Sequence, residues 1–270
     1  MAQYLRDILK EKSTRYYDKF CHIEKECKDI LPEINIPFPE YNDHAVKHAE
    51  NVEKIMEWLI PDDVKKSLNY EEIFCLLSAV WLHDIGKVLD KETKIFKKSK
   101  KDEKEKIKKN TRDLHHIRSY NFIKSNSTFK LNDREAEAIG NICKTHRKTT
   151  IISLDEKYKV NKKKVRLQFL GACLRLADKC DINSDRIISK QFKKTRFTWE
   201  FTPHTKKHKF NFVNFQNSKR KIRLEAKVTS IKDLKILIDT KEKIQKELDE
   251  SKPILSQNKL ILNTIELKLL

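Results

Sequence analysis

The sequence predicts a mainly α-helical protein: a helical bundle followed by a small α+β antiparallel module. From Tyr41 to about Ile182, apolar residues recur every three or four positions, which is the period of a helix with one buried face. After Ile182 the period changes to two, which is typical of half-buried antiparallel strands. We therefore expect a helical domain over residues 1–189 and a C-terminal module over residues 190–270.

Each expected helix begins at a residue that can cap it. Four such positions precede apolar stripes: Asn42 or Asp43, Asn69, Asn132 and Asn161. Glu72 follows Asn69 by three residues, which is the spacing of a capping box. The helix that Asn69 opens runs into WLHDIGK, residues 81–87, and this places His83 and Asp84 at the end of an apolar run.

Residues 90–112 interrupt the apolar pattern. They contain 11 basic and 5 acidic side chains and almost nothing apolar beyond Ile95, Phe96 and Ile107. We expect a solvated loop or a frayed helix there.

Alternating apolar residues predict strands in the C-terminal module. The alternation covers residues 197–202, 222–228 and 260–269, and a helix near 231–249 separates the last two. The segment KFNFVNF, residues 209–215, shifts phase midway, as a β-bulge would.

Positive charge is concentrated in the last third of the chain. The net charge is +19, and residues 190–228 carry 12 basic but only 2 acidic side chains. Such an excess favours attraction to nucleic acid. Because Lys outnumbers Arg by 47 to 12, a compositional bias that fills solvated positions with Lys is an open alternative.

Composition also argues against several classes of protein. The chain has no run of about 18 uncharged apolar residues, and its first 20 residues are charged where a signal peptide would be apolar. We therefore expect a soluble cytoplasmic protein with no membrane partner. The six cysteines form no CxxC pair, which argues against a zinc ribbon and favours small core residues in a reducing compartment.

Six imidazoles and carboxylates stand on the apolar stripes of different helices: His48, His83, Asp84, His115, His146 and Asp178. A single histidine on such a stripe is usually a satisfied core residue. A buried polar pair without a partner costs about 2 to 7 kcal/mol, and metal coordination would compensate it. The nitrogen-rich set suits Mn, Fe, Co, Ni or Zn, with one or two ions per chain.

The order of these residues resembles the HD superfamily of metal-dependent phosphohydrolases over roughly residues 40–190. The resemblance implies an HD-type bundle in which His48 (in HAENV), the doublet His83 and Asp84, and Asp178 (in RLADKCD) bind metal. It also implies that His115 and His146 complete a second metal position.

Three phrases resemble the bacterial HD-CE branch of that superfamily: YNDHAVKH, HHIRS and LRLADKCDI. This branch implies a setting of conflict and phage defence, with a GHKL-type ATPase as a possible partner protein. RKTT follows His146 where cyclic-di-GMP phosphodiesterases have Gly-Tyr-Pro. IGK follows Asp84 where alarmone hydrolases have an acidic pair, so neither activity is expected.

Roles for the individual residues follow from charge. A carboxylate lowers the repulsion between two cations, so Asp84 is expected to bridge them. Lys87 and Arg118 lie one helical turn from ligands and are expected to contact phosphate oxygens, although either can be a plain surface cation.

For the other polar residues near the expected ligands, the sequence leaves more than one role open. His44 and His116 are expected to donate hydrogen bonds behind the ligands, to relay protons, or to be structural. Asp181 either orients a ligand histidine or caps its helix. His204 and His208 are expected in a turn.

The expected function is metal-dependent hydrolysis of phosphoester bonds in a nucleic acid or nucleotide, which includes DNA, RNA, deoxynucleoside triphosphates and cyclic nucleotides. The alternative is a metal-binding HD module with a regulatory role beside an ATPase. The complete ligand set favours the enzyme. The sequence does not discriminate between oligomeric states.

Overall fold

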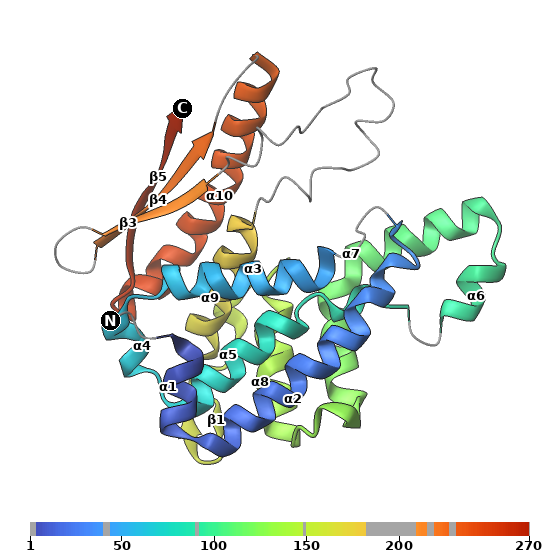
Figure 1. Cartoon of the computed structure of the whole chain (residues 1–270), viewed down its shortest axis with the longest axis horizontal. Coiled ribbons are helices and arrows are strands. Elements are labelled where there is room, and N and C mark those ends of the chain that lie inside the picture. The colour runs from blue at the N-terminus through green and yellow to red at the C-terminus, as the bar shows by residue number, and fades with distance from the viewer. Residues whose placement is uncertain are drawn as a thin grey trace.

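The structure is a computed structural model that describes residues 4–39, 44–89, 92–147, 150–181, 209–214, 219–226 and 231–269. Its helices are α1 (Leu5–Lys12), α2 (Thr14–Ile30), α3 (His44–Leu59), α4 (Asp62–Ser67), α5 (Tyr70–Leu82), α6 (Thr93–Lys98), α7 (Lys101–Ser125), α8 (Asp133–Lys144), α9 (Leu167–Cys180) and α10 (Ile231–Gln257). The strands are β1 (Lys159–Val160), β2 (Lys163–Lys164), β3 (Lys209–Asn214), β4 (Lys219–Ala226) and β5 (Ile261–Leu269). Short 3-10 helices include η1 (Leu31–Asn35), η3 (Ile85–Lys87), η5 (Ser127–Phe129) and η6 (Ile151–Ser153). The predicted fold class, mainly α with a small α+β part, is confirmed (Figure 1).

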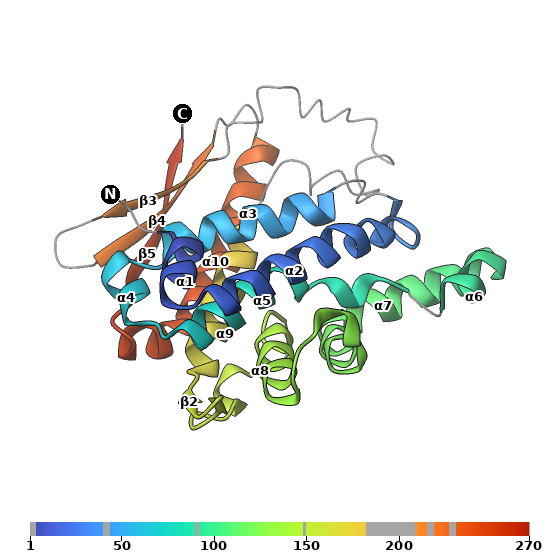
Figure 2. The ribbon, with the colours of Figure 1, turned by 60° about the horizontal axis from the view of Figure 1, so that its bottom comes forward.

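Helix α5 is the central element of the bundle. Every residue from Glu71 to Leu82 is buried, and a helix that is buried on all sides belongs to the core. Helices α1, α2, α3, α8 and α9 pack around it (Figures 1 and 2). The predicted capping box is present, because the Asn69 side chain accepts from Glu72 N at 2.9 Å and Glu72 accepts from Asn69 N at 3.1 Å.

The helix predicted to begin at Asn161 begins instead at Leu167, so that prediction is wrong. Asn161 and Lys162 have φ values of 46° and 68°, and they form the two-residue turn between β1 and β2. Asn tolerates this left-handed conformation as readily as it caps a helix, so it favours a tight hairpin as well. The Asn132 cap, by contrast, is confirmed at the start of α8. Positions 42 and 43 lie outside the described residues.

Of the two alternatives expected for the charged segment, the helix is the one observed over residues 93–112, with a short break at residues 99–100. They form α6 and the first half of α7, a 25-residue helix that continues into the bundle as far as Ser125. The expected solvent exposure is confirmed for most of this segment.

In the C-terminal module, the strands form one sheet in the order β3-β4-β5. β3 and β4 are antiparallel as predicted, but β5 runs parallel to β4 because α10 connects them as a crossover. The β3–β4 register is unbroken, so the bulge predicted in residues 209–215 is absent from the described part of that segment. The predicted strand at 197–202 lies outside the described residues.

Helix α10 joins this sheet to the bundle, because it packs on β5 and on α9. Arg175 of α9 donates hydrogen bonds to Glu247 and, at 2.5 Å, to Glu250 of α10. The division of the chain at residue 189 stays a prediction.

Two further expectations concern the cysteines and membrane-spanning helices. All six cysteines are free thiols, and five of them are buried, as expected for core residues. Among the described helices, none is both long enough and apolar enough to span a membrane.

Candidate metal centre

The HD doublet lies where α5 ends and the chain turns through η3 toward α7. Ser119 of α7 donates its hydroxyl to the His83 carbonyl at 2.7 Å and accepts from the Gly86 amide at 2.9 Å. Arg118 donates from Nε to the Gly86 carbonyl at 2.8 Å. These bonds fix the backbone on both sides of Asp84, and they attach α7 directly to the doublet.

The six predicted ligands come together from five helices or helix ends. They form two groups of ligand atoms, each within 4.8 Å of one another: His48, His83 and Asp178 in the first, and Asp84, His115 and His146 in the second. In the first group, His48 Nε2 is 3.0 Å from His83 Nε2 and 3.1 Å from Asp178 Oδ1. In the second group, the Nε2 atoms of His115 and His146 are 2.7 Å apart.

Asp84 lies between the two groups and presents one oxygen to each. Its Oδ2 is 3.7 Å from the Nε2 atoms of both His48 and His83, and its Oδ1 is 3.3 Å from His115 Nε2 and 3.7 Å from His146 Nε2. This is the geometry of the predicted bridging carboxylate.

The outer nitrogen of every candidate histidine ligand has a hydrogen-bond acceptor. Three of the rings donate from Nδ1 to the carbonyl three residues earlier: His83 to Val80 at 2.8 Å, His115 to Arg112 at 2.7 Å and His146 to Cys143 at 2.5 Å. His48 donates to the carboxylate of Asp181 at 2.5 Å. A neutral ring that donates from Nδ1 has only a lone pair on Nε2, so all four inner nitrogens are fixed as acceptors.

Metal ions fit this donor set. The Nε2 atoms of His115 and His146 lie 2.7 Å apart, and those of His48 and His83 lie 3.0 Å apart. While both rings of a pair are neutral, two lone pairs face each other with no proton between them, and a cation bound by both nitrogens removes this repulsion. Burial keeps one ring of each pair neutral, because it lowers the pKa of His83 to about 4 and that of His146 well below its usual value. Imidazole and carboxylate ligands together are typical of first-row transition metals and zinc.

Lys87 places a positive charge beside the Asp84 carboxylate. Burial raises the pKa of Asp84, but Lys87, His83 and His115 outweigh it and hold the carboxyl pKa well below its usual range. Lys87 Nζ is 2.5 Å from Asp84 Oδ2, so this predicted phosphate contact lies at the ligand cluster.

The other predicted residues take different positions. Arg118 donates to Gly86, Val88 and Glu92 and so holds η3 on α7. The His116 ring lies 6.1 Å from that of His115 and is buried. The side chain of His44, and both His204 and His208, lie outside what the structure describes.

Two functional contacts were harder to see in the sequence. Asp181 accepts a hydrogen bond from His48 and also ends α9, so both expectations for it hold. Ser119 was missed, although its position four residues after His115 places it on the same face of α7.

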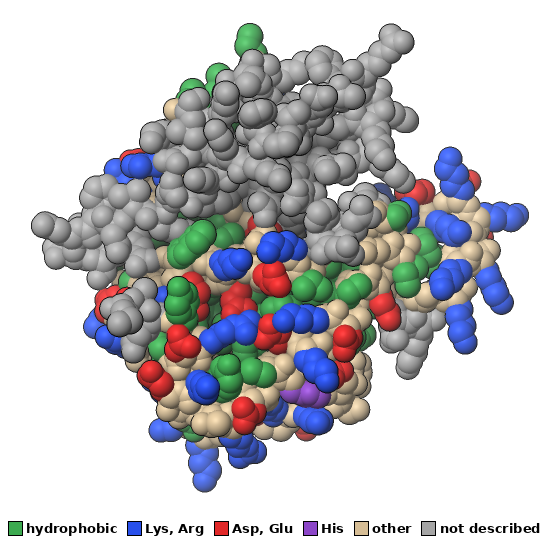
Figure 3. Space-filling model, viewed as in Figure 1, with side chains coloured by type: hydrophobic (Ala, Val, Ile, Leu, Met, Phe, Trp, Pro, Cys, Tyr) green, Lys and Arg blue, Asp and Glu red, His purple; other side chains and the backbone are tan. Residues whose placement is uncertain are grey.

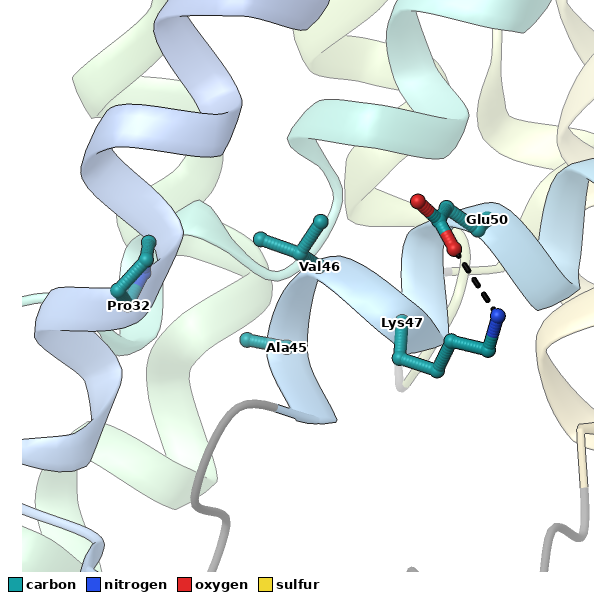
Figure 4. A pocket seen from close by; sticks show the side chains of 5 residues that line it. All are labelled: Pro32, Ala45, Val46, Lys47 and Glu50. Carbon is teal, nitrogen blue, oxygen red and sulfur yellow. Dashed lines mark hydrogen bonds and ion pairs between the residues drawn. The ribbon is translucent and has the colours of Figure 1, made fainter.

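A hollow of about 320 Å³ lies nearby, beside the first turns of α3 (Figure 4). It is lined by Pro32, Ala45, Val46, Lys47 and Glu50, and Lys47 and Glu50 form an ion pair at 3.1 Å. None of the six candidate ligands lines it, so it is distinct from the metal centre.

Replacing Asp181 with asparagine is expected to lower metal affinity about 10- to 100-fold, because the His48 ring loses the charged acceptor that orients it. Metal titration of the purified variant measures the effect. Asn51→Ala removes only a 3.4 Å bond to the other Asp181 oxygen and serves as the control. Equal affinities of wild type and Asp181→Asn would show that the carboxylate is only a helix cap.

In the metal-free protein, stability is expected to fall as pH drops from about 6.5 to about 4. An unfolded histidine takes up a proton near pH 6.5. His83 and His146 stay neutral in the folded state, because burial lowers both pKa values. The unfolded state therefore binds more protons in this pH range. For each histidine, the free energy of unfolding falls by up to about 1.4 kcal/mol for each pH unit. Thermal unfolding in a chelator measures this slope, and His146→Gln should flatten it. An unchanged slope in that variant would contradict the assignment.

Comparison with known protein families finds a match. A family model described as HD-CE covers residues 38–250, which is most of the chain. No curated protein matches the sequence.

Proposed function

The chain belongs to the HD-CE family, and from this premise we propose that it is a metal-dependent phosphohydrolase that cleaves phosphoester bonds in a nucleic acid or nucleotide. The observation that carries the proposal is the sharing of Asp84 between two groups of buried ligands. A purely structural metal site needs one closed set of ligands and no bridge.

The roles of the residues follow from their positions. His48, His83 and Asp178 would hold one divalent ion, and His115 and His146 a second, with Asp84 shared. Ions bound there would supply charge stabilisation to a phosphate and lower the pKa of an attacking water. The negative charge of Asp84 lowers the repulsion between two cations, which the neutral imidazoles cannot do.

Among the cations that the structure describes, Lys87 is the best placed to meet an incoming phosphate. Its ammonium group lies against Asp84 and is held by the 3-10 turn of η3. An ammonium group has three donors, so Lys87 can keep its bond to Asp84 while it donates to a phosphate oxygen. We propose phosphate binding for Lys87 and a positioning role for Arg118.

Metal analysis of the purified protein, followed by hydrolysis assays with added Mn²⁺, tests the proposal. The substrates are single-stranded DNA, RNA, deoxynucleoside triphosphates and cyclic nucleotides. We expect bound transition metal and metal-dependent cleavage of at least one of them. Bound metal without cleavage would favour a regulatory HD module beside an ATPase partner. A role in phage defence, which the sequence resemblance implies, belongs to the proposal and is tested by phage challenge of cells that carry an Asp84 variant.

A further inference from the structure

A basic helical arm projects from the bundle. It consists of α6 and residues 101–112 of α7, and it extends beyond the other helices in both ribbon views (Figures 1 and 2). Phe96 of α6 is buried, and Lys104 of α7 lies over its ring with Nζ 5.6 Å from the centroid. Figure 3 shows Lys and Arg side chains around this projection.

The basic side chains of α7 include a stripe on one face of the helix. Lys101, Lys104, Lys108 and Arg112 follow one another at intervals of three, four and four residues, and His115 comes three residues later. At 3.6 residues per turn these positions share one face. The stripe therefore leads along α7 to a ligand of the second metal group.

We propose that this stripe, Lys101 to Arg112, binds the phosphate backbone of a single-stranded nucleic acid whose scissile phosphate lies at the metal centre. The proposal rests on the proposed function and names its substrate class. A buried centre admits a thin chain more readily than a duplex, and a basic track beside it is the usual way to bind a single strand without sequence preference.

The length of the stripe decides between a polymer and a mononucleotide. Lys101 and His115 are 14 positions apart, which is about 21 Å along a helix. A mononucleotide bound at the metal centre is too short to reach the far end of the stripe. Only a substrate with several successive phosphates can use all four cations.

Among the residues that the structure describes, the C-terminal strands form a weaker binding surface for a phosphate backbone than the stripe does. Lys221 forms an ion pair with Glu266 of β5, and Arg223 lies 3.4 Å from the same carboxylate. One glutamate thus offsets part of the charge of both cations. On α7, Lys108 of the stripe has a comparable contact, at 3.4 Å from Glu105 on the same face, and Lys101 and Arg112 are exposed.

A membrane surface fits the stripe poorly. Of the exposed apolar residues of α7, Ile117 lies about 140° to 180° around the helix from Lys104 and Lys108, and Leu114 lies about 80° to 120° from them. A helix that buried Leu114 and Ile117 in lipid would turn the basic stripe toward water.

The test compares two variants of the full chain that remove the same charge from opposite sides of α7. Lys101→Gln/Lys104→Gln changes the stripe, and Lys106→Gln/Lys109→Gln is the matched control. The probe is a fluorescent single-stranded phosphorothioate DNA of about 20 nucleotides, which resists cleavage, and its affinity is measured by anisotropy at several salt concentrations. The stripe variant should lower the slope of log affinity against log salt by about 1.4, or about 0.7 per lost phosphate contact, and the control should not.

Mn²⁺-dependent hydrolysis of bis(p-nitrophenyl) phosphate is measured in parallel, and we expect it unchanged in both variants. Equal slopes for the two variants, or binding to phosphatidylserine vesicles but not to the strand, would overturn the inference. A further outcome separates the two proposals. If the slope of log affinity against log salt falls only in the stripe variant, and no form of the protein cleaves the small diester, then the binding surface is supported and the proposed hydrolase activity is not.

Discussion

Replacing Asp84 with asparagine is expected to lower phosphodiester hydrolysis by about a thousandfold or more. The second ligand group loses its only carboxylate and keeps two imidazole rings, whereas the first group keeps His48, His83 and Asp178. Loss of one ion removes several kcal/mol of charge stabilisation, and each 1.4 kcal/mol is a factor of ten in rate. The metal content should fall from two ions per chain toward one.

Elemental analysis and the rate of the Mn²⁺-dependent reaction measure the two effects on the same preparation. Asp113→Asn makes the same chemical change two residues before His115 on α7 and should alter neither value. A wild-type content of one ion per chain that persists in both Asp84→Asn and His146→Ala would contradict the assignment of the second group.

Gly86→Ala is expected to have the largest effect on stability. A Cβ atom at this position would lie 2.2 Å from the His115 carbonyl oxygen and 2.3 Å from the Ser119 amide nitrogen. Both are backbone atoms of α7, so the whole helix must move away from η3 and take His115 with it. Overpacking usually costs about 1 to 3 kcal/mol, and this backbone clash belongs at the upper end or beyond.

Thermal unfolding and metal content report the outcome, with an expected loss of about 6 °C or more in Tm. The other two glycines of the chain supply controls. At Gly140 a Cβ meets the ring of Tyr120, and at Gly171 it meets the side chain of Thr145. Side chains can move where backbone cannot, so both alanine variants should be milder. A Gly86→Ala protein as stable as the Gly140→Ala protein would refute the tight η3–α7 contact.

The convergence of the six candidate ligands could be predicted from the sequence because burial and polarity conflict at each of them. His48, His146 and Asp178 interrupt apolar stripes, and such interruptions need a compensating partner. The acceptors of the outer nitrogens could not be predicted in the same way. Most of them are backbone carbonyls, which every residue has, and their use depends on the conformation of each helix.

The open points and the errors in the predicted fold have physical causes as well. The first half of α7 has no apolar stripe, so periodicity left a loop and a frayed helix open, and the helix forms because Lys and Glu are strong helix formers. The Lys100 amide donates to Glu103 at 2.9 Å and so secures the first turn. The direction of β5 depends on the path of α10 across the sheet, which strand alternation does not encode.

The wide separation of the ligands along the chain has a consequence for biosynthesis. His48 and Asp178 lie in the same metal group, but 130 residues separate them in the sequence. At about 5 to 20 residues per second, a ribosome needs roughly 6 to 26 s to add the second ligand after the first. During that time the nascent chain exposes histidines and thiols without their partners, and the cell must keep copper and other tightly binding ions away from them. We therefore expect the fidelity of metal loading to depend partly on the speed of translation.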